Sequence, residues 1–168
     1  MSKHLLLALG LLVSTATLAQ TTPSPIPTDY TLKAPADFDR YAPQVVATID
    51  WLEVSALPSQ NEQRLAANTF LVAWISGSPT VSVAIEEYIN DLYNKDGDLL
   101  IAFMGGWTRY AIQNPGTKDK LVLATAGIKD MLATYKAKGG KGNKKLEELD
   151  KLSASGQLPD WVKKHVKA

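Results

Sequence analysis

Apolar residues recur every three or four positions along most of this chain, which is the spacing of an amphipathic helix rather than of a strand. Residues 117–138 show it most regularly, because Leu121, Ile128 and Leu132 fall on one stripe. Glycine, proline and asparagine separate the periodic segments, as is typical of helix ends. We therefore predict an all-α fold, a single compact bundle of about five to seven helices. The longer helices are expected at residues 41–54, 59–76, 79–94, 98–113 and 117–138, with short ones after Asn143 and from about residue 159.

Two of these segments are expected to be the central helices of the bundle, namely 59–76 and 98–113. Residues 69–75 and 99–107 carry no charged side chain, so each stretch is apolar on every side and suited to burial. Gly105 and Gly106 fall inside the second helix, where each costs about 1 kcal/mol relative to alanine. We expect close approach of another helix or of a ligand to compensate for that cost.

Local signals mark several of the expected helix ends. Ser59 and Glu62 have the spacing of a capping box, in which the hydroxyl and the carboxylate bind backbone N–H groups at the start of a helix. Gly77, Ser78 and Pro79 suit, in that order, a left-handed helix end, an N-cap and a first helical position. The spacing predicts that two helices meet here in a tight corner.

The first 19 residues have the pattern of a secretory signal peptide, because a basic start precedes the apolar run Leu5 to Val13 and small residues precede Ala19. That run has 9 residues, about half of the roughly 20 that a membrane-spanning helix needs. We therefore expect a secreted or periplasmic protein with no membrane anchor after cleavage; an uncleaved N-terminal anchor is the alternative. Residues 20–36 are rich in proline and predict a flexible tether, which leads into a single helical domain at 37–168.

Charge is distributed unevenly along the chain, although the formal net charge is only +1. Residues 20–115 carry 5 basic and 11 acidic side chains, whereas residues 116–168 carry 12 lysines and 6 acidic side chains. Such a chain either pairs its own halves or orients an encounter with a charged partner. We favour pairing between the halves.

Composition excludes several kinds of chemistry. Cysteine is absent and histidine occurs twice, which excludes disulfide scaffolds, thiol chemistry and cysteine-based metal sites. His165, the one histidine beyond the predicted signal peptide, lies near the C-terminus, where a catalytic group is poorly held. Residues 94–98 resemble the opening of a calcium loop but lack its later glycine and glutamate, so we expect a turn and a helix cap there. No cofactor and no metal site is predicted.

The remaining charged clusters are interpreted as solvated surfaces. Asp50 with Glu53, and Glu86 or Glu87 with Asp91, share single helix faces, as paired acids on an exposed helix do. The lysine-rich segment 136–145 lacks interleaved arginines and has one neighbouring aromatic residue, so no nucleic-acid partner is predicted.

Residues 103–110 form the segment that most suggests a site. Arg109 is one of only three arginines, and its planar guanidinium suits paired hydrogen bonds that lysine cannot make. We expect an internal ion pair with Glu86, Glu87 or Asp91 and aromatic neighbours packed in the core. The alternative is a binding site made of Gly105, Gly106, Trp107, Arg109 and Tyr110.

Three motifs, WISGSPTV at 74–81, FMGGWTRY at 103–110 and WVKK at 161–164, resemble those of a group of small exported bacterial all-helical proteins with no assigned activity. The resemblance covers about residues 40–164, implies the helical fold and brings no catalytic residue.

Two functions follow as hypotheses. The preferred one is a non-enzymatic binding, inhibitor or accessory protein of the cell envelope, whose partner is another envelope or extracellular protein. An export signal without a recognisable set of catalytic residues favours it. The alternative is a small-ligand binder or weak hydrolase with a pocket beside Gly105, Gly106 and Arg109.

Overall fold

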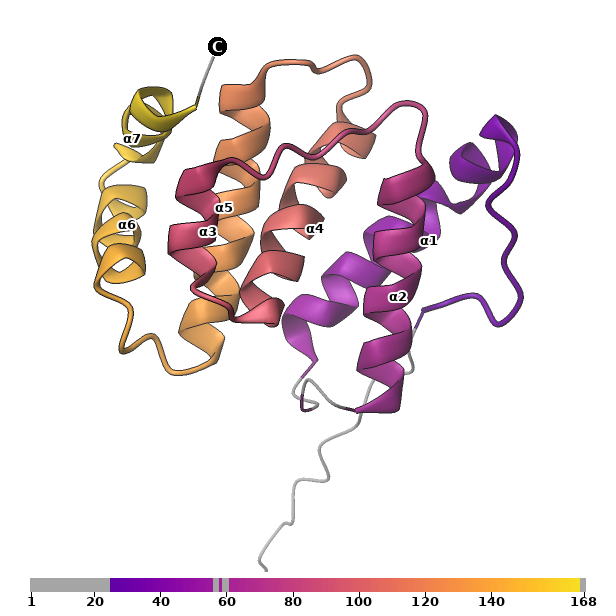
Figure 1. Ribbon diagram of the computed structural model, residues 1–168, viewed down its shortest axis with the longest axis horizontal. Helices are drawn as coiled ribbons and strands as arrows, with labels where there is room; N and C mark the ends of the chain where they lie inside the picture. The colour runs from indigo at the N-terminus through magenta and orange to yellow at the C-terminus, as the bar shows by residue number, and fades with distance from the viewer. Residues whose placement is uncertain (1–24, 56–57, 59–60, 167–168) are drawn as a thin grey trace, which may run out of the picture.

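The computed structural model describes residues 25–55, 58 and 61–166, and this part of the chain folds into seven helices without a strand (Figure 1). The predicted all-α bundle is confirmed. The predicted signal peptide lies outside the described residues. The helices are α1 (Pro35–Val54), α2 (Glu62–Gly77), α3 (Glu87–Tyr93), α4 (Gly97–Gln113), α5 (Lys120–Ala137), α6 (Lys144–Ala154) and α7 (Leu158–His165).

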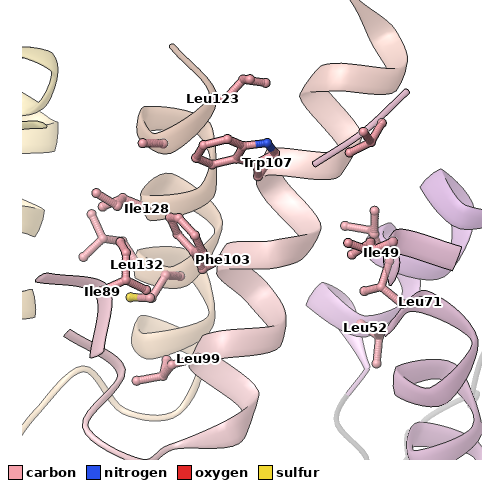
Figure 2. Packing of buried hydrophobic residues seen from close by; sticks show 14 of the residues in the cluster. Ile49, Leu52, Leu71, Ile89, Leu99, Phe103, Trp107, Leu123, Ile128 and Leu132 are labelled. Atoms are coloured by element: carbon pink, nitrogen blue, oxygen red, sulfur yellow. The ribbon is translucent and has the colours of Figure 1, made fainter. Parts of the chain in front are cut away.

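Helices α4 and α5 run side by side in the middle of the molecule (Figure 1). Helices α1 and α2 pack on the α4 side, whereas α6 and α7 cover α5. Phe103 and Trp107 of α4 lie against α5 in Figure 2, and Ile49 of α1 lies on the other side of α4. Helix α2 contributes large buried side chains, as its charge-free half predicted: Phe70, Leu71 and Trp74 are at most 2% exposed.

Glycines allow α4 and α5 to approach closely. A Cβ atom on Gly106 would lie 2.6 Å from the Asp130 carboxyl carbon and 2.7 Å from the Ala126 carbonyl oxygen. A Cβ atom on Gly127 of α5 would lie 2.7 Å from the Phe103 carbonyl oxygen of α4. Each distance is shorter than any real Cβ contact, so the two backbones meet because both positions lack a side chain. Close packing of α4 on α5 therefore offsets the cost of a glycine inside a helix, as one of the two expected explanations.

The segment predicted to be helical at 79–94 is helical only over α3. Residues 80–86 have no helical turn, and the run Thr80, Val81 and Val83 is rich in β-branched residues, which disfavour a helix. The predicted corner is therefore wrong. Gly77 is the last residue of α2 and faces the Phe38 ring, where a Cβ atom would come within 2.6 Å of the ring.

Helices α1 and α2 also begin elsewhere than predicted. Asn61 caps α2, because its side-chain oxygen accepts hydrogen bonds from the backbone N–H groups of Gln63 and Arg64. Ser59 of the predicted capping box lies outside the described residues. Helix α1 begins at Pro35 rather than at residue 41, and the Asp37 carboxylate accepts hydrogen bonds from the backbone N–H groups of Ala34 and Lys33. These hydrogen bonds lower the pKa of Asp37.

The described part of the expected tether packs onto the bundle. Residues 25–34 form no helix or strand, but Ile26, Tyr30 and Leu32 contact the core. The Tyr30 ring lies 4.8 Å from that of Phe70 in an edge-on contact. The packed structure therefore begins before the predicted domain boundary at residue 37. None of the described helices has the length and apolar character that a membrane span requires.

Replacing Gly106 with alanine is expected to lower the free energy of unfolding by about 1 to 3 kcal/mol, because the methyl group overlaps atoms of α5. Gly97→Ala, at the first residue of the same helix, is the control, since a Cβ atom there meets nothing within 4 Å. Urea unfolding of the two variants measures the difference. Equal stability would contradict the packing role of Gly106.

Candidate functional site

Arg109, the centre of the predicted site, binds three carboxylates from two other helices. Its Nη1 atom lies 2.6 Å from Asp50 Oδ1 and 2.9 Å from Glu53 Oε2, both on α1. Its Nη2 atom lies 2.9 Å from Glu53 Oε1 and 2.6 Å from Asp130 Oδ2 on α5. Glu53 therefore binds the guanidinium through both oxygens, a geometry that arginine alone among the cationic side chains provides.

The internal ion pair was predicted, but its partners were not. Asp91 binds Lys145 instead, with 2.7 Å between the two groups, and neither Glu86 nor Glu87 forms an ion pair with Arg109 in the described structure. Asp50 and Glu53, interpreted as a solvated pair, face α4 because α1 packs against it. The spacing of three placed both acids on one helix face, but only the packing shows what that face contacts.

One arginine does not neutralise three carboxylates, and the excess negative charge acts on Asp130. Burial raises the pKa of Asp130, the nearby Glu53 carboxylate raises it further, and Arg109 opposes both, leaving it at about 7. Burial works against the charged form of Arg109 as well, but its hydrogen bonds to Glu53 and Asp50 raise its pKa overall. The site thus holds a permanent cation beside a carboxyl group that titrates near neutrality.

The other predicted site residues are used mainly in packing. Gly105 contacts Ile49, Gly106 contacts Asp130, and Trp107 is 3% exposed. Tyr110 is half-buried against the core. The hollow that Gly105 lines has a volume of about 10 Å³, which is close to the least that one water molecule needs. A binding role for these residues stays a prediction.

A larger cleft, of about 290 Å³, lies next to that hollow, and its cationic groups are already paired. Arg64 donates a hydrogen bond to the Leu52 carbonyl oxygen and lies 3.7 Å from Asp98. Lys138 binds Asp96 and Asp98 at 2.6 and 3.0 Å. Asp96 also caps α4, as expected for residues 94–98. The Lys138 ion pairs join the basic half of the chain to the acidic half, as predicted.

The described surface also has a groove lined by aromatic rings from α3 and α7 and by residues of α6. Figure 1 shows where these three helices lie in the fold. Two adjoining hollows of about 240 and 220 Å³ share Tyr88, Asp91 and His165. The Trp161 ring stacks on His165 with 3.8 Å between the centroids, and Tyr88 lies 5.8 Å from both. We call this the aromatic groove, and its full lining is Glu86, Glu87, Tyr88, Asp91, Leu92, Lys145, Glu148, Leu149, Trp161 and His165.

The rings of the aromatic groove are held in place by their own contacts. Leu92 and Leu149 beneath them are 1% exposed and belong to the core. The His165 Nδ1 atom lies 2.8 Å from the Trp161 carbonyl oxygen. Burial, assisted by the nearby Glu86 carboxylate, raises the pKa of Tyr88 to about 12, so its hydroxyl group stays protonated. The groove therefore presents aromatic rings that are fixed by their neighbours.

Sequence reasoning missed this groove. Trp161 and His165 are four residues apart on one predicted helix, so their proximity was available from the sequence. Tyr88 is 73 positions before Trp161, and no local pattern joins them. In the described residues, no group of three or more histidine or acidic side chains has the geometry to hold a metal ion.

No protein-family model, curated protein or solved structure matches this chain. The resemblance to small exported helical proteins therefore stays a prediction, and the site is interpreted from its own geometry.

Replacing Arg109 with methionine is expected to lower the free energy of unfolding by about 2 to 4 kcal/mol, because Glu53 and Asp130 lose their cation while partly buried. Lys136→Met is the matched control; it breaks the exposed Lys136 to Asp150 pair and should cost less than about 1 kcal/mol. Urea unfolding measures both. An Arg109→Met variant as stable as the wild type would show that the network adds nothing to stability.

Replacing Asp130 with asparagine tests the shifted pKa. The folded-state pKa of about 7 lies above the ordinary value of 3.8, so the folded chain binds more protons than the unfolded chain between the two values. This group therefore favours folding most at acid pH, and that advantage is lost as the pH rises to about 7. The melting temperature of Asp130→Asn minus that of the wild type should increase from about pH 5 to about pH 7.5. A constant difference would contradict the shift, and Asp39→Asn on the surface of α1 controls for loss of one aspartate.

Proposed function

We propose that this chain is an exported, non-enzymatic helical protein that binds another protein of the cell envelope or exterior through the aromatic groove. The observation that carries the proposal is the contact of Tyr88, Trp161 and His165 around two adjoining hollows at the surface. The export pattern of residues 1–19 supports the compartment. An inhibitor and an accessory protein are both consistent with such binding.

The exposure and mutual packing of the rings in the aromatic groove favour binding of a protein. Trp161 is half-buried, whereas Trp51, Trp74 and Trp107 are 2 to 5% exposed. Tryptophan and tyrosine supply much of the binding energy at protein interfaces, because they bury large area with few rotatable bonds. Their mutual packing fixes the rings before a partner arrives, which lowers the entropy lost on binding.

The alternative, a small-ligand pocket or weak hydrolase beside Gly105, Gly106 and Arg109, has less support. The cavity there has the volume of about one water molecule, and the guanidinium already binds three carboxylates. A ligand at Arg109 would have to displace at least one of them. The aromatic groove, by contrast, is open without rearrangement.

Two matched tyrosine variants separate the proposals. Tyr88 lines the aromatic groove and Tyr110 follows Arg109, and both are half-buried against the core. The wild-type protein and the variants Tyr88→Ala and Tyr110→Ala are immobilised, exposed to envelope extract and compared by quantitative mass spectrometry. Circular dichroism checks that all three are folded. We expect a partner that the wild type and Tyr110→Ala retain and that Tyr88→Ala loses by about tenfold or more.

The opposite pattern, with loss only in Tyr110→Ala, would favour the pocket beside Arg109. A partner retained equally by all three proteins, or no reproducible partner at low and high salt, would overturn the proposal that the aromatic groove binds protein.

A further inference from the structure

We infer that the aromatic groove takes a lysine- or arginine-bearing segment of its partner. This inference rests on the proposed function, since it names the chemistry of the occupant of the same groove. The charge around the groove and the rings inside it both favour such an occupant.

The groove is bordered by more acidic than basic groups. Glu86, Glu87, Asp91 and Glu148 line the two hollows, whereas Lys145 is the one lysine or arginine in that lining. Lys145 binds Asp91, with 2.7 Å between the charged atoms. With His165 neutral, the lining carries three net negative charges, so its field attracts cations.

Two of these acids are available for a partner. Glu87 and Glu148 are exposed, and within the described part of the chain neither has an ion-pair partner. They come from different helices, and each lines one of the two hollows: Glu87 of α3 lines the hollow of about 220 Å³ and Glu148 of α6 the hollow of about 240 Å³. Each hollow therefore offers one exposed carboxylate to a cationic side chain.

The rings suit the same occupant. A lysine or arginine head group is attracted to the face of tyrosine or tryptophan within about 6 Å, and its aliphatic stem packs on apolar surface. Tyr88 is neutral at neutral pH, as tyrosine ordinarily is, and burial and Glu86 raise its pKa further, to about 12, so it offers a ring and a hydroxyl group. Leu92 and Leu149 supply the apolar floor for the stem. The two adjoining hollows suit side chains from a short extended segment.

The test uses synthetic peptides and the fluorescence of Trp161. Because the other three tryptophans are nearly fully buried, a change in acrylamide-accessible emission reports chiefly on the groove. Three eight-residue peptides alternate glycine with lysine, with glutamine or with glutamate. We expect saturable binding of the lysine peptide, weakened at least about fivefold by raising the salt from about 50 to about 300 mM, and no binding of the glutamate peptide. Isothermal titration calorimetry confirms the affinities independently of fluorescence.

A charge-matched pair of variants places the binding at the groove. The Glu87→Gln, Glu148→Gln double variant should weaken the lysine peptide about tenfold. The Asp39→Asn, Glu62→Gln double variant removes two exposed acids elsewhere, on α1 and α2, and should leave affinity within about twofold. Equal weakening by both double variants, or equal affinity for the lysine and glutamine peptides, would overturn the inference.

The two proposals fail in different ways. A partner that depends on Tyr88 but binds the Glu87→Gln, Glu148→Gln variant as tightly as the wild type overturns the basic-segment inference and leaves the proposed function standing. Lysine-peptide binding that depends on Glu87 and Glu148, together with no protein partner that depends on Tyr88, overturns the proposed function alone.

Discussion

The close contact of α4 with α5 is the constraint on which the rest of the described structure depends. It exists because Gly106 and Gly127 leave room for the opposite helix, where a Cβ atom at either position would overlap neighbouring atoms unless they shifted. The contact brings Asp130 of α5 beside Arg109 of α4, and α1 packs on the other side of α4. One interhelical distance therefore decides which charged groups meet at the junction of three helices.

The junction and the groove use charge in opposite ways. At Arg109 one guanidinium binds all three carboxylates, of which Asp130 and Glu53 are partly buried and Asp50 is exposed, and these ion pairs join α1, α4 and α5. At the aromatic groove two exposed carboxylates, Glu87 and Glu148, have no ion-pair partner among the described residues, and aromatic rings line the same two hollows. Charged groups that are paired inside the fold fix how the helices pack, whereas exposed acids beside apolar surface can bind a cationic partner.

Helix positions followed from the sequence wherever periodicity, caps and composition agreed. For α4 and α5 a regular stripe or a charge-free stretch stands between clear stop signals, and Asn143 caps α6 as its position predicted. The sequence signals conflicted at residues 79–86, where the apolar spacing favoured a helix but the β-branched residues disfavoured one. Val81 is buried as the apolar pattern required, but in a segment without helical turns.

The sequence by itself determined the fold class, most helix positions, the buried faces and the need for some close contact at Gly105 and Gly106, because these depend on neighbours within a few residues. Only the tertiary structure decided that Asp50, Glu53 and Asp130 bind Arg109, and that Tyr88 lies beside Trp161 and His165. These partners are 21 to 77 positions apart in the chain, and a helix pattern states which face is buried but not which helix buries it. Tertiary packing decides which helices become neighbours, through the close contacts at glycines and the contacts between aromatic rings.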